Sequence, residues 1–191
     1  ILEQILIRLR LAGCEHITLI VNTSNYSFFA DQKHNIECST GLIVDFLLDP
    51  PALSGTAAWL LEIAPNFDED IVVLNGDTYL DGDIYSFINH SLSSIVGTFS
   101  SARDDAGNIA VDSSGKVIQF SEKSSLSKAF NSPSLNYSGI LKIQKEQIPS
   151  LLLYLTQLNT STLSLEHDVL PFLAKTNKLY IFNFPIEAFD I

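Results

Sequence analysis

The sequence predicts an α/β fold in which helices flank a mixed, mainly parallel sheet. Its first part alternates helical periodicity with short β-branched apolar runs, a pattern typical of parallel strands covered on both faces. A hairpin pattern further along adds antiparallel strands. The 191 residues are 46% apolar and 17% charged, which is a globular balance. We expect one domain over residues 1–191 that buries roughly 70% of the surface of the unfolded chain.

The N-terminal segment is predicted to begin with a helix and a buried strand. Apolar residues at helical spacing predict a helix over Ile1–Ala12, and Gly13 follows as a stop signal. The β-branched run Ile17–Val21 predicts a strand covered on both faces. The polar residues Asn22–Asn25 are interpreted as the loop after this strand.

The remaining elements are predicted from the same two periodicities. Short runs of β-branched, aromatic and other apolar residues predict strands over Leu42–Leu48, Ile71–Leu74, Ser94–Phe99, Ser138–Ile143 and Leu179–Phe184. Apolar residues three or four positions apart predict helices over Thr56–Ala64, Gln147–Leu158 and Leu163–Ala174. The turn cluster Asp112–Gly115 predicts a hairpin over Asn108–Phe120, which makes the sheet mixed.

Composition excludes some classes of function. The formal net charge of −11 argues against binding to a nucleic-acid backbone, which needs a surplus of Lys and Arg. A nucleotide is not excluded, because a divalent cation and backbone amides neutralise phosphates locally. No apolar run reaches the ~18 residues that cross a bilayer, and Cys14 and Cys38 form no disulfide framework. We therefore expect the cytoplasm, and, since the chain starts at Ile1 without any Met, a natural N-terminus upstream.

The strongest local signal is Asn75-Gly76-Asp77, which follows the predicted strand Ile71–Leu74. Ligands of open parallel sheets collect beyond the carboxyl ends of strands, and this acid follows a glycine turn at such an end. Asp77 is therefore a candidate magnesium ligand, because Mg²⁺ takes one or two carboxylates together with substrate phosphate oxygens. The alternative is a plain turn, in which these residue types are common.

A second signal is the Ser54-Gly55-Thr56 turn that opens onto a predicted helix. Amides at a helix N-terminus attract a phosphate or the polar edge of a base, and glycine allows a ligand to come close. The alternative is that the hydroxyl of Ser54 or Thr56 only caps the helix.

Two weaker signals involve charged residues. The neighbouring side chains of Glu122 and Lys123 suit the hydroxyls and the phosphate of a sugar phosphate, although most such pairs are solvated surface charges. Asp190 follows the last predicted strand between apolar residues, where it is either a second metal ligand or part of a frayed terminus. The four histidines show no metal-ligand spacing and are interpreted as surface or structural residues.

These signals occur in an order that resembles the sugar-phosphate nucleotidyltransferases, particularly the mannose and heptose 1-phosphate guanylyltransferases. The resemblance extends over nearly the whole chain. Its segments are ILEQILIRLRLAGCEHITLIV, SGTAAWLL, VLNGDTYLD, GNIAVDSSGKVIQFSEK, NYSGILKI, SLEHDVLPFLA and FDI.

The resemblance implies a Rossmann-like fold and transfer of a nucleotidyl group, with GTP favoured, from a nucleoside triphosphate to a sugar 1-phosphate. Asp77 and Asp190 correspond to two magnesium-binding aspartates. The other candidate residues correspond to substrate contacts. Gly55 and Thr56 lie beside the base, and Asn75 and Gly76 form the turn at the strand end. Gly107 and Gly139 let the backbone approach the sugar, and Glu122 and the catalytic Lys123 bind the sugar phosphate. It also implies a place in nucleotide-sugar and polysaccharide biosynthesis, with the oligomeric state left open.

Four departures separate the chain from the family pattern. The family's Gly-rich triphosphate loop is expected before Ile1, and its usual continuation is expected after FDI, so both ends are interpreted as truncated or disordered. The turn LDPPALSGTAA is longer and less acidic than usual, and Tyr137 stands where Asn or a small residue is common. Two alternatives stay open: a non-catalytic domain that binds nucleotide sugars, and a cytidylyltransferase that acts on a small phosphorylated alcohol.

Overall fold

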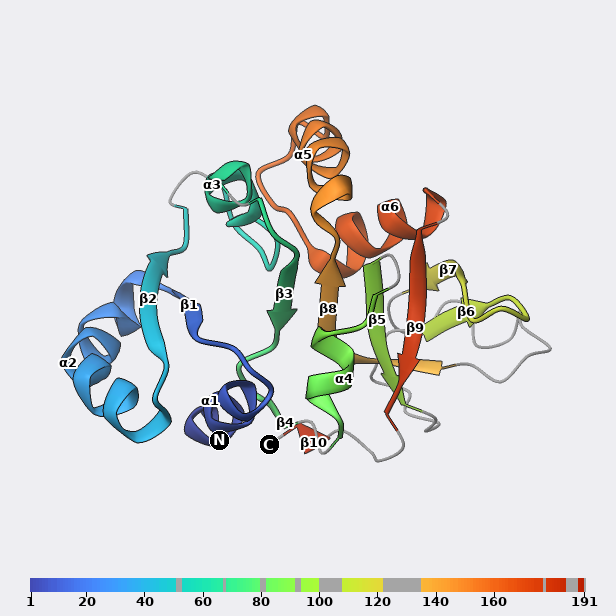
Figure 1. Cartoon of the computed structure of the whole chain (residues 1–191). Helices are drawn as coiled ribbons and strands as arrows, with labels where there is room; N and C mark the ends of the chain where they lie inside the picture. The colour runs from blue at the N-terminus through green and yellow to red at the C-terminus, as the bar shows by residue number, and fades with distance from the viewer. Residues whose placement is uncertain are drawn as a thin grey trace.

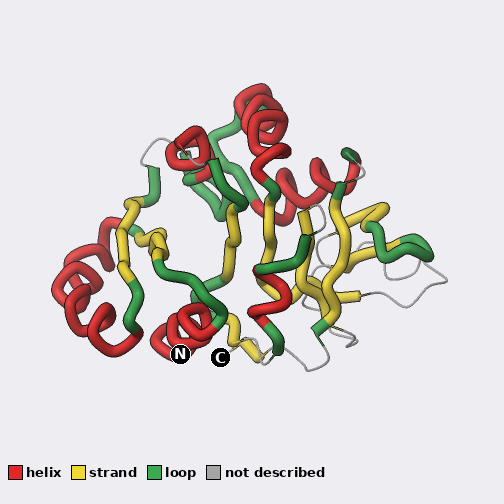
Figure 2. The backbone as a smooth tube through the Cα atoms, viewed as in Figure 1, coloured by secondary structure: helices red, strands yellow, loops and turns green. Residues whose placement is uncertain are grey.

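The computed structural model describes residues 1–50, 53–66, 68–79, 82–91, 94–99, 108–121, 135–176, 178–184 and 189–190. Strands form the middle of the molecule and helices lie on both sides of them (Figure 1, Figure 2). The structure therefore confirms an α/β fold with a mixed sheet flanked by helices.

The N-terminal part is a helix-strand-helix-strand unit. Its elements are α1 (Leu2–Leu11), β1 (His16–Val21), α2 (Thr23–Thr40) and β2 (Ile43–Leu48). The two strands are parallel, with His16 opposite Ile43 and Val21 opposite Leu48. Helix α1 buries Ile5, Leu6 and Leu9, the residues whose spacing predicted it.

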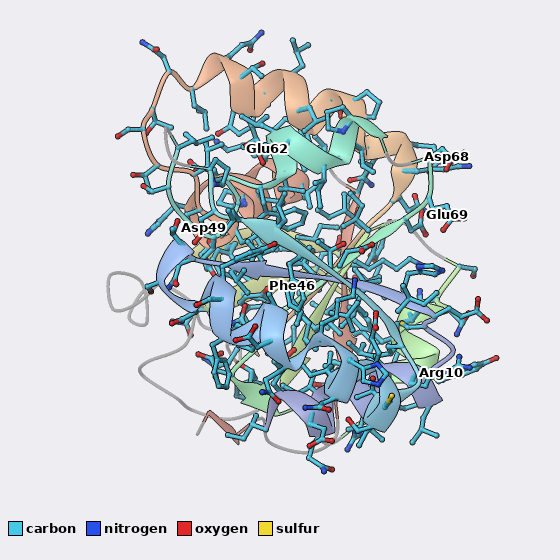
Figure 3. All side chains as sticks on the ribbon, turned by 90° about the vertical axis from the view of Figure 1, so that its left-hand side faces the viewer. Arg10, Phe46, Asp49, Glu62, Asp68 and Glu69 are labelled. Atoms are coloured by element: carbon cyan, nitrogen blue, oxygen red, sulfur yellow. The ribbon has the colours of Figure 1, made fainter. Side chains whose placement is uncertain are left out.

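The loop predicted at Asn22–Asn25 is wrong, because α2 starts at Thr23. The side chain of Asn22 accepts a 2.9 Å hydrogen bond from the Asn25 amide and caps the helix. The helix has no apolar stripe, since only Thr40 is buried among its described residues, so periodicity did not reveal it. Its Tyr26 and Phe29 rings lie 6.3 and 6.4 Å from Phe46 of β2, which Figure 3 labels on this side of the molecule.

A six-stranded sheet contains most of the remaining strands. Its members are β3 (Ile71–Leu74), β5 (Ser94–Phe99), β6 (Asn108–Val111), β7 (Val117–Ser121), β8 (Leu135–Ile143) and β9 (Leu179–Asn183). The order is β7-β6-β8-β5-β9, and β3 also pairs with β8. Strands β3, β5, β6 and β9 run in one direction, while β7 and β8 run in the other. Because β8 lies between β3 and β5, most described pairings between neighbouring strands in this sheet are antiparallel. The sheet is mainly parallel only in the sense that four of its six strands point in the same direction.

Several predicted helices are shorter or divided. The predicted helix Thr56–Ala64 is α3 (Leu60–Ile63), followed by a 3₁₀ turn over Ala64–Asn66. The two C-terminal helices are each preceded by a different helical turn, with a proline in the first turn of the α-helix. These pairs are the 3₁₀ turn Lys145–Gln147 with α5 (Ile148–Gln157), and the π-helix η3 (Leu165–Val169) with α6 (Leu170–Lys175).

Three short elements lack a sequence signal. They are β4 (Thr78–Tyr79), α4 (Ile84–Ile88) and β10 (Phe189–Asp190). Two-residue strands have no periodicity to detect, and a helix of five residues has barely more than one turn.

The hydrophobic core consists of two clusters of buried side chains, and each cluster includes residues from a different set of helices. One part gathers buried residues of α3, α5, η3 and α6, and the other gathers those of α1 and α4. Strands β5 and β8 contribute to both parts, with Val96 and Leu141 in the first and Ile95 and Ile140 in the second. The two strands therefore lie between the two helical layers (Figure 1).

Candidate functional site

The carboxyl end of β3 is fastened to β8 by backbone contacts. The Asn75 amide donates a 2.9 Å hydrogen bond to the Gly139 carbonyl oxygen. Gly139 has a φ of +80°, and a Cβ atom there would lie 3.1 Å from Asn75 Nδ2 and 3.2 Å from Thr78 Oγ1. Two residues from the predicted site, Asn75 and Gly139, therefore lie in direct contact, and the close approach favours glycine.

Asp77 projects from this strand end into solvent. Gly76 and Asp77 are exposed, whereas Thr78 is buried and begins β4. The Thr78 hydroxyl lies 3.4 Å from Asp77 Oδ1, at the long limit of a hydrogen bond. The carboxylate thus lies on a turn at the end of a largely half-buried strand and remains open to a ligand.

The backbone of Asp190 lies beside this turn. Strands β4 and β10 are antiparallel, with Asp190 opposite Thr78 and Phe189 opposite Tyr79. Figure 1 shows β10 against β4, below the end of β3. The frayed-terminus interpretation is therefore wrong for Asp190, because its backbone is paired with the residue that follows Asp77.

Among the residues that the structure describes, no group of three or more His, Cys, Asp or Glu side chains could by itself hold a metal ion. Mg²⁺ does not require such a cage, because it is commonly held by one or two carboxylates and by substrate phosphates. The donor type offered by Asp77 and Asp190 fits that pattern.

The Ser54-Gly55-Thr56 turn is bound to the segment before η3. Gly55 has a φ of +103°, and a Cβ atom on it would overlap the carbonyl oxygen of Leu163. Backbone hydrogen bonds join Leu163 N to Ser54 O at 2.8 Å and Ala57 N to Leu163 O at 3.0 Å. This turn is therefore a backbone contact between distant parts of the chain, and it requires glycine for a structural reason.

The Thr56 hydroxyl bridges to η3 and does not cap its own helix. It accepts a 2.9 Å hydrogen bond from the Leu165 amide and donates to Glu166 Oε2 at 3.1 Å. The Ser164 hydroxyl lies 3.0 Å from the same carboxylate oxygen. The Ser54 hydroxyl also bonds outside its helix, to Ser161 O at 3.2 Å. The capping alternative is therefore wrong for both residues.

Glu166 contacts the predicted site residue Thr56, and the sequence reasoning did not single it out. Its only signal was its place in the segment SLEHDVLPFLA. The predicted residues that the structure describes thus include two groups: the turn around Asp77, and Gly55 with Thr56, which Glu166 contacts.

Replacing Thr56 by Val should lower the free energy of unfolding by about 1–2 kcal/mol, because the Leu165 amide loses its acceptor and Glu166 loses a donor. Thr56→Ser keeps the hydroxyl and should cost less than about 0.5 kcal/mol. Urea unfolding of both variants measures the difference. Equal losses in the two variants would contradict the bridging role of the hydroxyl, because Thr56→Ser retains it.

Three predicted site residues, Gly107, Glu122 and Lys123, lie outside the described residues. Strand β7 ends at Ser121, directly before Glu122. Phe120 of this strand is buried and makes an edge-to-face contact with Tyr137, at 6.1 Å between ring centroids.

Comparison with known proteins matches residues 1–186 to the family model described as nucleotidyl transferase. Among solved structures, the chain is similar to HddC from Yersinia pseudotuberculosis, with a TM-score of 0.74 and 20% identity over 100% of this chain and 79% of that one. It is also similar to the same protein complexed with GMP-PN, with a TM-score of 0.71 and 19% identity over 99% of this chain and 78% of that one. These similarities show a shared fold.

The search of curated proteins found no match. In the part of the chain that the structure describes, no helix combines the length and the apolar character needed to cross a membrane.

Proposed function

Because the chain belongs to the nucleotidyl transferase family, we propose that it transfers a nucleotidyl group from a nucleoside triphosphate to a sugar 1-phosphate and releases pyrophosphate. The match to the family model confirms the family-level resemblance seen in the sequence. GTP is the favoured triphosphate. The similarity to HddC, which has been solved with GMP-PN, supports this choice. We propose that the reaction takes place in the cytoplasm. Its product would supply nucleotide sugars for polysaccharide synthesis.

The observation that carries the proposal is the pairing of β10 with β4. It sets the Asp190 backbone opposite Thr78, the residue after Asp77, beyond the end of β3. The backbones of two aspartates from distant parts of the chain thus lie close together near a strand end, the kind of place where ligands of α/β sheets bind. This arrangement supports Asp77 and Asp190 as the residues that would hold Mg²⁺. When bound, Mg²⁺ would offset the charge of the phosphate oxygens and help to align them.

In the proposed reaction, a phosphate oxygen of the sugar 1-phosphate attacks the α-phosphorus of the triphosphate. A new P–O bond forms, the bond to the β-phosphate bridging oxygen breaks, and pyrophosphate leaves with that electron pair. Gly55 and Thr56 would lie beside the base, and Asn75 and Gly76 would shape the strand-end turn. Gly107 and Gly139 would let the backbone approach the sugar. Catalysis then depends on positioning and charge, without a covalent enzyme intermediate.

Lys123 has the role of binding the sugar phosphate, with Glu122 on the sugar hydroxyls. Lys123→Ala should raise the KM for the sugar 1-phosphate at least about tenfold, because a charge-assisted contact to phosphate is lost. The KM for the triphosphate should change less than about twofold. Steady-state kinetics with each substrate varied in turn would separate the two effects. A similar rise in both values would exclude this specific role for Lys123.

The experiment that tests the function measures pyrophosphate release by the full chain with Mg²⁺. Each common nucleoside triphosphate is paired with mannose, glucose, heptose and N-acetylhexosamine 1-phosphates, and with a small phosphorylated alcohol. Release with one sugar pair supports the proposal and identifies both substrates. Release only with CTP and the alcohol phosphate would support a cytidylyltransferase. Folded protein that binds a nucleotide sugar but releases no pyrophosphate would support a non-catalytic binding domain.

A further inference from the structure

An exposed cysteine and an exposed histidine lie one helical turn apart on α2. His34 and Cys38 are four positions apart in the helix, so their side chains project from the same face. The Cys38 sulfur lies 3.6 Å from His34 Nε2 and 3.8 Å from His34 Nδ1. Both residues are open to solvent. The sequence did not reveal this pair, because α2 was not predicted and only a helix brings the two positions together.

The distance between sulfur and nitrogen suits a shared metal ion. In a tetrahedral zinc site the metal lies about 2.3 Å from sulfur and about 2.0–2.1 Å from nitrogen. Those bond lengths place the two ligand atoms about 3.5–3.6 Å apart. The observed distance from the Cys38 sulfur to His34 Nε2 is 3.6 Å. Because the helix backbone fixes the spacing of the two residues, rotation of the side chains is sufficient to aim both atoms at one ion.

The charges around the pair do not oppose a cation. The chain carries a formal net charge of −11. The adjacent basic residue, Lys33, is paired elsewhere, since its Nζ atom lies 3.7 Å from Glu37 Oε1 and 3.9 Å from Asp45 Oδ1 on β2. The ammonium group is thus held toward the strand, and two carboxylates offset its charge.

The donor atoms determine which kind of cation fits. A thiolate sulfur is a soft ligand and an imidazole nitrogen suits Zn²⁺ and copper ions, whereas Mg²⁺ prefers oxygen. The pair supplies two protein ligands, and the described residues contain no group of three or more His, Cys, Asp or Glu side chains that could hold a metal. Water would therefore occupy the other coordination positions, and the ion would stay accessible from solvent.

We propose that Cys38 and His34 form a surface site for a thiophilic divalent cation of the zinc type, distinct from the magnesium site proposed at Asp77. On binding, a metal–sulfur bond replaces the S–H bond of Cys38, and the proton passes to solvent. The ion would connect two residues one turn apart in α2, in which only Thr40 is buried among the described residues. Figure 1 shows this helix on the outer side of β1 and β2. Because few buried side chains hold α2 in place, the bound ion should stabilise it.

The test titrates the full chain, kept reduced, with Zn²⁺ in a calorimeter and with Cd²⁺ in an ultraviolet spectrometer. One ion should bind per chain, and Cd²⁺ should produce the charge-transfer absorbance of a metal–thiolate bond. Cys38→Ser should abolish this absorbance, and Cys38→Ser and His34→Gln should each weaken Zn²⁺ binding at least about tenfold, because one of two protein ligands is lost. Excess Mg²⁺ should not displace either metal. Thermal melts without metal verify that both variants fold.

Cys14 provides the matched control, because it is the other cysteine of the chain. It is half-buried, and burial raises the pKa of its thiol, which disfavours the thiolate that binds metal. Cys14→Ser should keep the cadmium absorbance and leave the Zn²⁺ affinity within about twofold of the wild-type value. His16→Gln is the control for the histidine, since His16 is also exposed but lies on β1.

Hydrogen exchange measures the expected effect on α2. The ion binds both side chains only while this turn is helical, so Zn²⁺ at about ten times its Kd should slow amide exchange between His34 and Cys38 about tenfold. The same addition should leave exchange in His34→Gln unchanged.

Each other outcome overturns the inference. Equal Zn²⁺ affinity of the wild type and Cys38→Ser would mean that the ion binds elsewhere. A loss in Cys14→Ser as large as that in Cys38→Ser would remove the specific role of the α2 pair. One ion for every two chains, together with a dimer in sedimentation, would mean a site shared between two copies. Bound Zn²⁺ with unchanged exchange in α2 would exclude the stabilising role of the ion. Pyrophosphate release is not measured here, so the result does not depend on the proposed function.

Discussion

Asp77→Asn should lower the rate of pyrophosphate release by about a thousandfold or more in the presence of Mg²⁺. The amide keeps the size of the carboxylate but removes the negative charge that would hold the metal. Asp77 is exposed, and its one described side-chain contact is a 3.4 Å approach of Thr78 Oγ1, so the fold should be unaffected. Turnover measured at saturating substrates, together with a thermal melt of the same sample, separates activity from folding.

Asp68→Asn is the matched control, because Asp68 is an exposed aspartate that precedes the other end of the same strand, β3. The same chemical change there should leave turnover within about twofold of the wild-type value. Near-normal turnover of Asp77→Asn would remove Asp77 from the reacting centre. It would also leave the pairing of β4 with β10 as a purely structural feature.

Gly55→Ala should destabilise the fold by about 2–4 kcal/mol. The residue has a φ of +103°, which disfavours any side chain, and a Cβ atom would overlap the Leu163 carbonyl oxygen. Relief of that overlap must separate two backbone segments that three hydrogen bonds join, at Ser54 N, Ala57 N and Leu163 N. Urea unfolding followed by circular dichroism measures the loss.

Gly76→Ala is the comparison for this effect. A Cβ atom on Gly76 meets no atom within 4 Å, and its φ is not in the left-handed region, so the free energy of unfolding should change less than about 0.5 kcal/mol. If Gly55→Ala proved as stable as Gly76→Ala, the turn would have to rearrange without a loss of folding free energy. The close contact with Leu163 would then not be a requirement of the fold.

The sequence predicted most strands well because each is a short run rich in β-branched and other apolar residues. The boundaries of β3 and β5 are those predicted, and the fold class followed from the alternation of helices and buried strands. Helix α2 was missed because it packs with few buried side chains and therefore lacks the apolar stripe that predicts a helix. Strand β8 is three residues longer than predicted at its N-terminal end, where polar Asn136 and aromatic Tyr137 are buried among other strands.

The part of the candidate site that the sequence predicted consists of polar residues that directly follow a recognisable strand. Asn75, Gly76 and Asp77 were identified because they directly follow a short apolar run that predicts a strand. Glu166 was not, because its link to Thr56 joins residues 110 positions apart and has no local signature.

The sequence by itself determined the α/β class, the family and the turn that carries Asp77, because local periodicity and short-range turn chemistry encode them. Only the tertiary structure decided that Asp190 lies opposite Thr78. It also decided that the Thr56 hydroxyl bonds to η3 and does not cap its own helix. It also decided that Gly55 is required by its contact with Leu163. The physical reason is common to these findings: strand register, side-chain burial and long-range hydrogen bonds depend on which distant segments pack together, and that choice is made by the whole core at once.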